Sequence, residues 1–481
     1  MEQSVKKLPL RVNGRENKKQ KNGFLKGAAW IAAGGFIAKM IGALYRIPLT
    51  NLIGGYGLGL YQLVYPVYCL LLTVSATGIP SSIAKLTAER LGQGKSARPL
   101  FKTAMKLFLL VGACGTALMI LLAPFLATAQ GSKQVVGGYY TLAPSVFLVS
   151  AISVFRGWFQ GRNKMYPTAV SEISEQLVKV GFGLFFAYLF RANVERAVVF
   201  LLLSVSLSEL FTLFLMLALF RRIPAPKETV ENAQNTQPVS MRTVLKLSIP
   251  VTLSSMLLPL SGLLDSVLVP RLLGAYADNA VTLYGLFSGG AVTVINLPVS
   301  VCYGIAAASV PSVAMAVARE QTGQKSNPRK KIWYSLFITV AVSLPCAIGL
   351  YFFAEPVAKI IFRSLAGDEL TVLIRLIRAF SVSALTLSCV QTLSACLTAQ
   401  GKPQLSALSM LIAVGVKTAV YAVLLKNPEI SVFGLAYATN ICYLVAFALD
   451  LVYNLYVSKK RARSNENDHS NRFGSGKGRS D

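Results

Sequence analysis

The feature that most constrains this chain is a series of twelve apolar runs, each long enough to cross a bilayer as a helix. So many runs cannot be hidden in one water-soluble core. Only 14% of the 481 residues are charged and 54% are hydrophobic, whereas soluble domains usually carry about 25% charged residues. The pattern predicts an all-α polytopic membrane protein with about twelve transmembrane helices. The predicted spans are 27–49, 58–84, 103–128, 136–156, 165–190, 197–220, 243–272, 282–317, 332–354, 371–399, 404–425 and 431–457.

The net charge of +28 would suggest a nucleic-acid partner in a soluble protein. Here most Lys and Arg residues lie in the two terminal segments and in the loops after even-numbered spans. Lys and Arg accumulate in the cytoplasmic loops of membrane proteins. We therefore expect a multi-pass protein of the cytoplasmic membrane with both termini in the cytoplasm, surrounded by lipid and not bound to nucleic acid.

The two halves of the chain resemble each other. Four residues that end the second span recur 231 positions later at the end of the eighth: Pro80, Ser81, Glu89 and Gly92 match Pro311, Ser312, Glu320 and Gly323. Odd spans match odd spans, which indicates a parallel repeat with a substrate site between two lobes. The predicted organisation is a cytoplasmic basic tail (1–26), a six-helix lobe (27–220), a cytoplasmic linker (221–240), a second six-helix lobe (241–457) and a cytoplasmic polar tail (458–481).

Charged residues inside the first span are the main candidates for substrate binding. A charge at the centre of a span costs roughly 2.5–3.5 kcal/mol on insertion scales, so it normally faces a cavity or a partner. Lys39 and Arg46 are seven residues apart and share one helix face. They predict a cationic wall for an anionic substrate. Snorkelling, or pairing with a carboxylate elsewhere, is the alternative.

Span 7, the repeat counterpart of span 1, carries Asp265 and Arg271. We expect Asp265 to pair with a span 1 cation or to bind a coupling ion, and Arg271 lies near the outer end, where snorkelling is easy. Arg156, at the cytoplasmic end of span 4, is a further substrate-binding candidate, because Gly157 and Gly161 beside it permit close backbone approach.

A polar stripe runs along the fifth span. Glu172, Glu175, Gln176 and Lys179 recur at spacings of three and four, so they share one face. Two interpretations are open: a satisfied helix–helix network, or the lining of a cavity. Lys417 lies in span 11, the counterpart of span 5, as a possible analogue. The buried acids Glu209 and Asp450 are interpreted as structural partners.

Several kinds of chemistry find no support in the sequence. The seven cysteines lie in apolar runs without a C-x-x-C pair, and His469 is the single histidine. A metal site, a disulfide framework and a histidine-based catalytic triad are therefore not expected. No cofactor-binding or ATPase motif is present, so transport would be driven by gradients of ions or substrate.

Three stretches resemble a known family: KMIGALYRIPLTNLIGGYGLGLYQLVYP in spans 1–2, TGIPSSIAKLTAE ending span 2, and SVFRGWFQGRNKMYPTAVSEISEQLVKV across spans 4–5. They are similar to the MurJ/SpoVB-like oligosaccharide-lipid flippase branch of the multidrug/oligosaccharidyl-lipid/polysaccharide (MOP) exporter superfamily. The resemblance implies two lobes around a V-shaped cavity, alternating access and a polyprenyl-pyrophosphate-linked sugar as cargo. Arg46 fits the arginine of the family's first-span motif, whereas Lys39 stands where relatives often have arginine. The chain departs from the peptidoglycan flippases in having twelve spans in place of fourteen and no basic residue in the matching parts of spans 2 and 8.

The resulting hypothesis is a secondary flippase, and not an enzyme, for a lipid-linked cell-wall, spore-cortex or polysaccharide precursor. A coupling ion and cell-wall synthesis enzymes are further candidate partners. The nearest alternative is a cation-coupled multidrug exporter of the same superfamily, which would favour buried carboxylates. A membrane enzyme or a scaffold in wall synthesis is the alternative of another class. An enzyme would need a large outer loop or a clustered acidic pair; the longest outer loop, near 355–370, is too short for a domain, although it holds Glu355, Asp368 and Glu369.

Overall fold

The computed structural model describes residues 14–223, 241–321 and 326–474, and nearly all of them are helical. Parts of the predicted terminal tails and most of the predicted linker lie outside the described residues. The helices are α1 (Gly14–Leu72), α2 (Ile79–Gly92), α3 (Arg98–Ala129), α4 (Val136–Gly161), α5 (Tyr166–Leu189), α6 (Val194–Arg222), α8 (Met241–Ser255), α9 (Leu257–Leu273), α10 (Ala280–Gly285), α11 (Val292–Gln321), α12 (Pro328–Phe352), α13 (Ala354–Ile361), α14 (Gly367–Phe380), α15 (Val382–Ala399), α16 (Pro403–Leu424) and α17 (Phe433–Gly474). Short π-helical segments, Thr73–Thr77 and Leu286–Ala291, precede α2 and α11.

Nine helical segments of the described residues are long and apolar enough to cross a membrane. One of them, Ala33–Gly92, covers the first two predicted spans. The spans expected at 165–190 and 243–272 are not among the nine. The first is α5, which carries Glu172, Glu175 and Lys179, and the second is divided between α8 and α9. The predicted all-α multi-pass membrane fold is confirmed.

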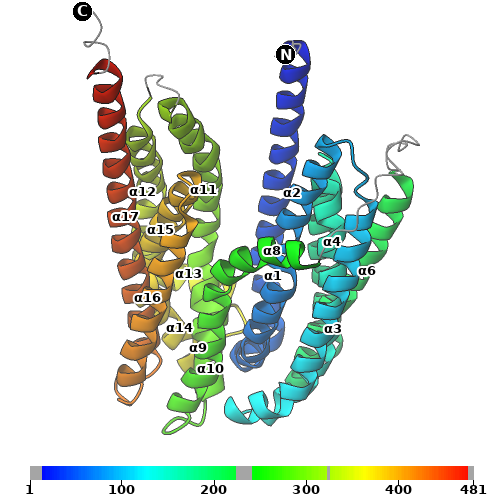
Figure 1. The fold of residues 1–481 in the computed structure, drawn as a ribbon. Coiled ribbons are helices and arrows are strands. Elements are labelled where there is room, and N and C mark those ends of the chain that lie inside the picture. The colour runs from blue at the N-terminus through cyan, green and yellow to red at the C-terminus, as the bar shows by residue number, and fades with distance from the viewer. Residues whose placement is uncertain (1–13, 224–240, 322–325, 475–481) are drawn as a thin grey trace, which may run out of the picture.

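The first two spans form one α-helical element because the break between them is confined to a single residue. Gly54 has φ +67° and ψ −172°, a conformation that side-chain-bearing residues rarely adopt. Here the chain reverses, and the second part of α1 runs back toward α2 (Figure 1). Two further turns rely on local capping, since Asn193 accepts from the backbone N–H of Arg196 at 3.0 Å and Asn327 from that of Lys330 at 3.0 Å.

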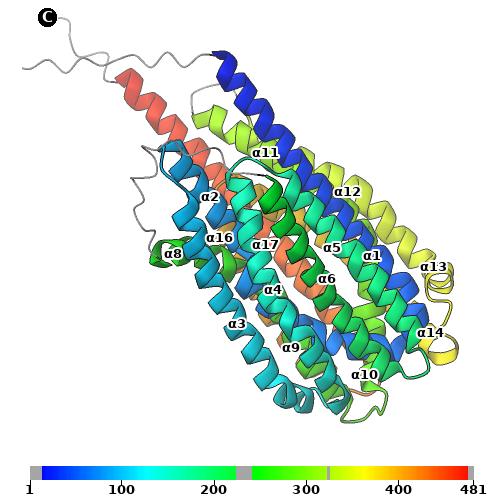
Figure 2. The same cartoon turned by 90° about the vertical axis from the view of Figure 1, so that its right-hand side faces the viewer.

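The helices gather in two groups, one formed by α1–α6 and the other by α9–α17 (Figure 1). The N-terminal part of α1 and the C-terminal part of α17 project from the same end of the molecule in both views (Figures 1 and 2). We refer to this as the terminal end. Both helices continue past the predicted span boundaries into polar sequence, as α1 begins at Gly14 and α17 ends at Gly474.

The two groups are joined at the opposite end. A Cβ atom added at Gly59 would overlap the carbonyl oxygen of Val281, and one added at Gly285 would overlap the backbone of Gly59. Asn51 adds a polar clasp: its Nδ2 donates to the carbonyl of Ile361 at 2.9 Å, and its Oδ1 accepts from the backbone N–H of Ser364 at 3.1 Å. Close glycine contacts and paired hydrogen bonds therefore close the molecule at the end away from the termini.

Helix α8 crosses from the second group to the first (Figure 1). Its Val244 is fully buried in a cluster with Ile79, Ile83 and Leu100 of the first group. A Cβ at Gly78 would overlap the carbonyl oxygen of Ser248. The seventh predicted span is thus broken near Met256, and its first half packs on the other lobe.

Candidate functional site

A cavity of about 400 Å³ lies between the two groups of helices. Its polar wall combines residues of α1, α5 and α11, and its lining contains cations but no Asp or Glu. The polar lining residues are Lys39, Tyr45, Arg46, Tyr61, Gln62, Tyr65, Gln176, Lys179, Thr293, Asn296 and Ser300. Three cationic side chains facing one cavity without an acid give a site whose electrostatic preference is for an anion.

Arg46 of α1 is one of the cations that line this cavity. Its Nη1 donates to Thr293 Oγ1 at 3.0 Å, and so links α1 of the first group to α11 of the second. Its carbonyl accepts from Thr50 Oγ1 at 2.7 Å, one turn before the Asn51 clasp. The half-buried guanidinium keeps donors that can reach a phosphate in the bidentate geometry that arginine favours.

Lys39 lies two turns along the same face of α1, as the sequence predicted. Its exposed side chain places Nζ 3.2 Å from the centroid of the Tyr303 ring, a cation–π contact. Lys39 also lines a second cavity of about 500 Å³. That cavity is walled by α9, α15, α16 and α17, and Asp450 lies in its lining. Lys39 therefore stands where the two cavities meet.

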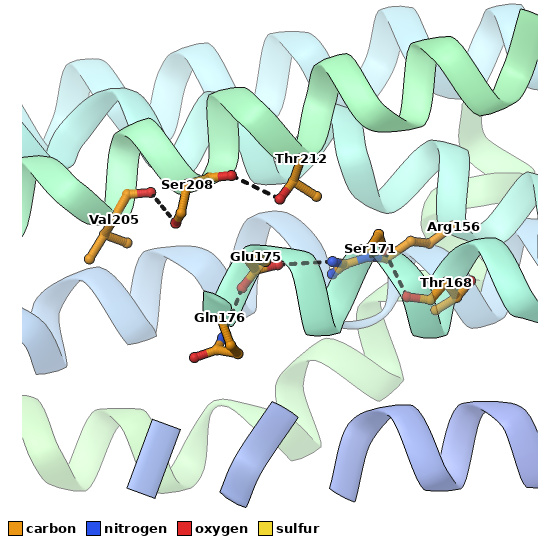
Figure 3. Close-up of polar contacts among 8 residues, drawn as sticks. All are labelled: Arg156, Thr168, Ser171, Glu175, Gln176, Val205, Ser208 and Thr212. Atoms are coloured by element: carbon orange, nitrogen blue, oxygen red, sulfur yellow. Dashed lines mark hydrogen bonds and ion pairs between the residues drawn. The ribbon is translucent and has the colours of Figure 1, made fainter. Parts of the chain in front are cut away.

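The polar stripe on α5 is divided between two environments. Gln176 and Lys179 line the cavity. Glu175 turns toward α4, where its Oε2 accepts from Arg156 Nη2 at 2.9 Å. Figure 3 shows this pair and the second contact of Arg156, from Nε to Ser171 Oγ at 3.0 Å. Gln176 and Lys179 fit the interpretation of the stripe as a cavity lining, and Glu175 fits the interpretation as a helix–helix network. Arg156 belongs to that network and not to the cavity lining.

Asp265 does not pair with a cation of the first span. Its Oδ2 lies 2.5 Å from Lys417 Nζ, and the same ammonium donates to Ser261 Oγ at 2.7 Å. The pair joins α9 to α16 inside the second group, with Lys417 5% exposed. Arg271 lies in the last turn of α9 with an exposed side chain.

Several lining residues escaped the sequence analysis because they are neutral. Gln62, Thr293, Asn296 and Ser300 all face the cavity. Asn296 and Ser300 are four residues apart in an apolar span. This spacing places both on one helix face and could have indicated a polar lining. Among the described residues no cluster of three or more His, Cys, Asp and Glu side chains could hold a metal ion.

Comparison with known proteins shows which family the chain belongs to. Residues 24–317 match the model of the polysaccharide biosynthesis protein family. The chain belongs to that family. It is 25% identical over 428 residues to Stage V sporulation protein B of Bacillus subtilis (strain 168), which covers 87% of this chain and 81% of the relative.

Solved structures of two membrane transporters share the fold. A multidrug resistance MATE family transporter of the MOP superfamily, in an inward-facing conformation, has a TM-score of 0.74 at 16% identity, covering 89% of this chain and 96% of that one. Lipid II flippase MurJ, in an inward closed conformation, has a TM-score of 0.66 at 14% identity, covering 90% and 91%. The resemblance to the flippase branch of the MOP superfamily is confirmed, and with it a two-lobed transporter fold.

Proposed function

We propose that this chain is a secondary transporter that flips a polyprenyl-pyrophosphate-linked oligosaccharide across the cytoplasmic membrane by alternating access. The observation that carries the proposal is the cavity between the lobes, where Lys39, Arg46 and Lys179 face one volume whose lining has no carboxylate. A pyrophosphate is the part of such a lipid that needs cations at membrane depth. Cations held in a low-dielectric wall attract it more strongly than cations in water.

The proposed orientation places the terminal end in the cytoplasm, because Lys and Arg are concentrated there and in the loops that follow even-numbered spans. The lobes are then closed on the outer side by Asn51 and the contact between Gly59 and Gly285. Arg46 lies one turn from that closure. Arg46 and Thr293 belong to different lobes. An anion that binds to both would therefore act directly on the contact between the lobes that must open to release the cargo.

A cation-coupled multidrug exporter is the second candidate, favoured by one observation. The second cavity is lined by both aliphatic and polar residues and has one buried carboxylate, Asp450, which accepts from Ser394 at 2.6 Å. A lipophilic cation would fit such a lining. We rank it second because Lys39 lies at the junction of the two cavities and would repel a cation on its way in.

We do not propose an enzyme. Of the acids on the outer segment, Glu355 accepts from Lys359 Nζ at 2.7 Å. This contact lowers the pKa of Glu355 below its usual value, whereas a general acid needs a raised one. The proposed partners are the lipid-linked substrate and the bilayer, with a coupling ion and wall-synthesis enzymes as further partners.

The test is a binding comparison on the detergent-purified protein with farnesyl pyrophosphate and with farnesol, its uncharged counterpart. We expect saturable binding of the pyrophosphate and at least tenfold weaker binding of the alcohol. Arg375→Ala, which removes an exposed arginine of α14, is the control that should bind like wild type. Equal affinity for the two compounds, or tighter binding of an organic cation such as tetraphenylphosphonium, would overturn the proposal in favour of the exporter.

A further inference from the structure

A buried acid in the first lobe has no partner to neutralise it. Glu209 lies in the middle of α6, 3% exposed, and its Oε2 makes no hydrogen bond within the described part of the chain. Glu209 also forms no ion pair with any described Lys or Arg. A carboxylate in an apolar lobe without a hydrogen-bonded cation carries the full cost of losing its water.

The hydroxyl groups beside Glu209 on α6 are already used. Ser208 Oγ donates to the carbonyl of Val205 at 2.8 Å, and Thr212 Oγ1 donates to the carbonyl of Ser208 at 2.8 Å. Figure 3 shows both side chains turned back onto their own helix. A serine or threonine hydroxyl has one proton to donate, so neither side chain can satisfy the carboxylate.

Of the two cations that act on Glu209, Arg156 is engaged elsewhere. Arg156 of α4 directs Nη2 to Glu175 and Nε to Ser171 (Figure 3). Glu175 in turn accepts from Gln176 Nε2 at 3.2 Å. The charged and titratable groups that act on Glu209 are Tyr68 of α1, whose hydroxyl is a hydrogen-bond partner of the carboxyl group, Arg156 of α4, and Glu175 and Lys179 of α5. Glu209 is thus a second carboxylate beside the Arg156–Glu175 ion pair, whose two charges already cancel.

We propose that Glu209 is a proton-binding site, occupied by a proton in this conformation and linked through Lys179 to anion binding in the cavity. Protonation removes the buried negative charge and makes the carboxyl group a donor. Two neighbouring carboxyl groups, of which only one is paired with an arginine, do not both ionise readily, because each disfavours the charge of the other. The site lies on α6 within the first lobe, and Glu209 is not part of the cavity lining.

Lys179 is the link, because it belongs to both sites. Its side chain lines the cavity and its charge also acts on Glu209. An anion bound in the cavity partly neutralises the positive charge of the Lys179 ammonium. The ammonium then stabilises the ionised form of Glu209 less. Anion binding therefore favours protonation of Glu209, and by linkage protonation of Glu209 favours anion binding. This step, unlike the proton site itself, rests on the proposed function.

The proton site is tested without any cargo by infrared difference spectroscopy of the purified protein at neutral pH. Wild type minus Glu209→Gln should show the C=O stretching band of a protonated carboxyl group. Wild type minus Glu195→Gln is the matched control: the same substitution at the exposed start of α6 should show only ionised carboxylate bands. Glu209→Asp keeps the acid, so it should shift the band in frequency without abolishing it. Carboxylate bands alone in the Glu209→Gln difference would overturn the proposal.

The link to the cavity is tested by titration calorimetry of farnesyl pyrophosphate in two buffers of different ionisation enthalpy. At a pH raised until the infrared band of Glu209 has fallen to half its height, so that the group is partly ionised, we expect wild type to take up more protons on binding than Glu209→Gln, whose side chain cannot titrate. Equal uptake by the two proteins would refute the link. If farnesyl pyrophosphate does not bind at all, the proposed function and the link fail together, whereas the infrared result still decides whether Glu209 holds a proton.

Discussion

The two lobes hold their buried charges differently, although the sequence predicts that they are copies of one repeat. In the second lobe Lys417 and Asp265 form a closed pair, 2.5 Å apart, with Ser261 as a third partner. In the first lobe the counterpart helix α5 sends Glu175 to Arg156 but leaves Lys179 facing the cavity. The comparison shows a cation neutralised inside the second lobe and a cation exposed to the cavity in the first, which is the difference that the proposed anion site needs.

The largest effect is expected from breaking the ion pair between Lys417 and Asp265. Asp265→Ala leaves the buried Lys417 ammonium without its acid, and breaking such a pair typically costs about 3–5 kcal/mol. We expect a clear loss of thermal stability in detergent and little change in the affinity of any protein that stays folded. The double variant Asp265→Ala with Lys417→Met should recover most of the lost stability. A single variant as stable as wild type would show that the pair is not a structural element.

The second largest effect is expected from removing Arg46, a cation of the cavity lining. Arg46→Ala should weaken farnesyl pyrophosphate binding about 10- to 100-fold, since hydrogen bonds to charged groups contribute about 1.5–3 kcal/mol. Equilibrium binding on the purified protein measures this. Arg46→Lys should recover part of the affinity, because the charge stays but the bidentate fork is lost. Unchanged affinity in Arg46→Ala would remove the basis for an anion site in this lobe.

A smaller effect is expected at the junction of the cavities. Lys39 is exposed and screened by solvent, and a charge pair in water contributes about 1 kcal/mol. Lys39→Ala should therefore weaken binding about fivefold, and this loss should shrink at high salt. An effect as large as that of Arg46→Ala, and independent of salt, would mean that Lys39 is buried in the complex.

The smallest effect is expected at Arg271, which shares its helix with Asp265 but has an exposed side chain. Arg271→Ala should change stability by less than about 0.5 kcal/mol and leave pyrophosphate affinity as it is. Binding and melting curves recorded beside those of Asp265→Ala provide the check. A binding defect here would extend the anion site to the outer end of the second lobe.

The sequence revealed the parts of the fold that depend on local pattern. Apolar runs marked the spans, and the seven-residue spacing of Lys39 and Arg46 placed both on one face, where the structure has them lining one cavity. The helical period carries that information without any knowledge of packing.

Contacts between distant segments were not predictable in this way. Asp265 was expected to pair with a cation of the first span or to bind a coupling ion, but its partner is Lys417, more than 150 residues along the chain. Nothing in the local sequence of either residue specifies which helices become neighbours. The second cavity and the crossing of α8 onto the first lobe likewise depend on packing between helices that are far apart in sequence.

The most direct measurement of the central claim is native mass spectrometry of the detergent-purified protein, searching for lipid that co-purifies with it. The account predicts a bound polyprenyl-pyrophosphate-linked glycan that is retained in Arg375→Ala and lost in Arg46→Ala, and its mass would identify the cargo. The absence of such a lipid from wild type, together with saturable binding of organic cations, would contradict the account.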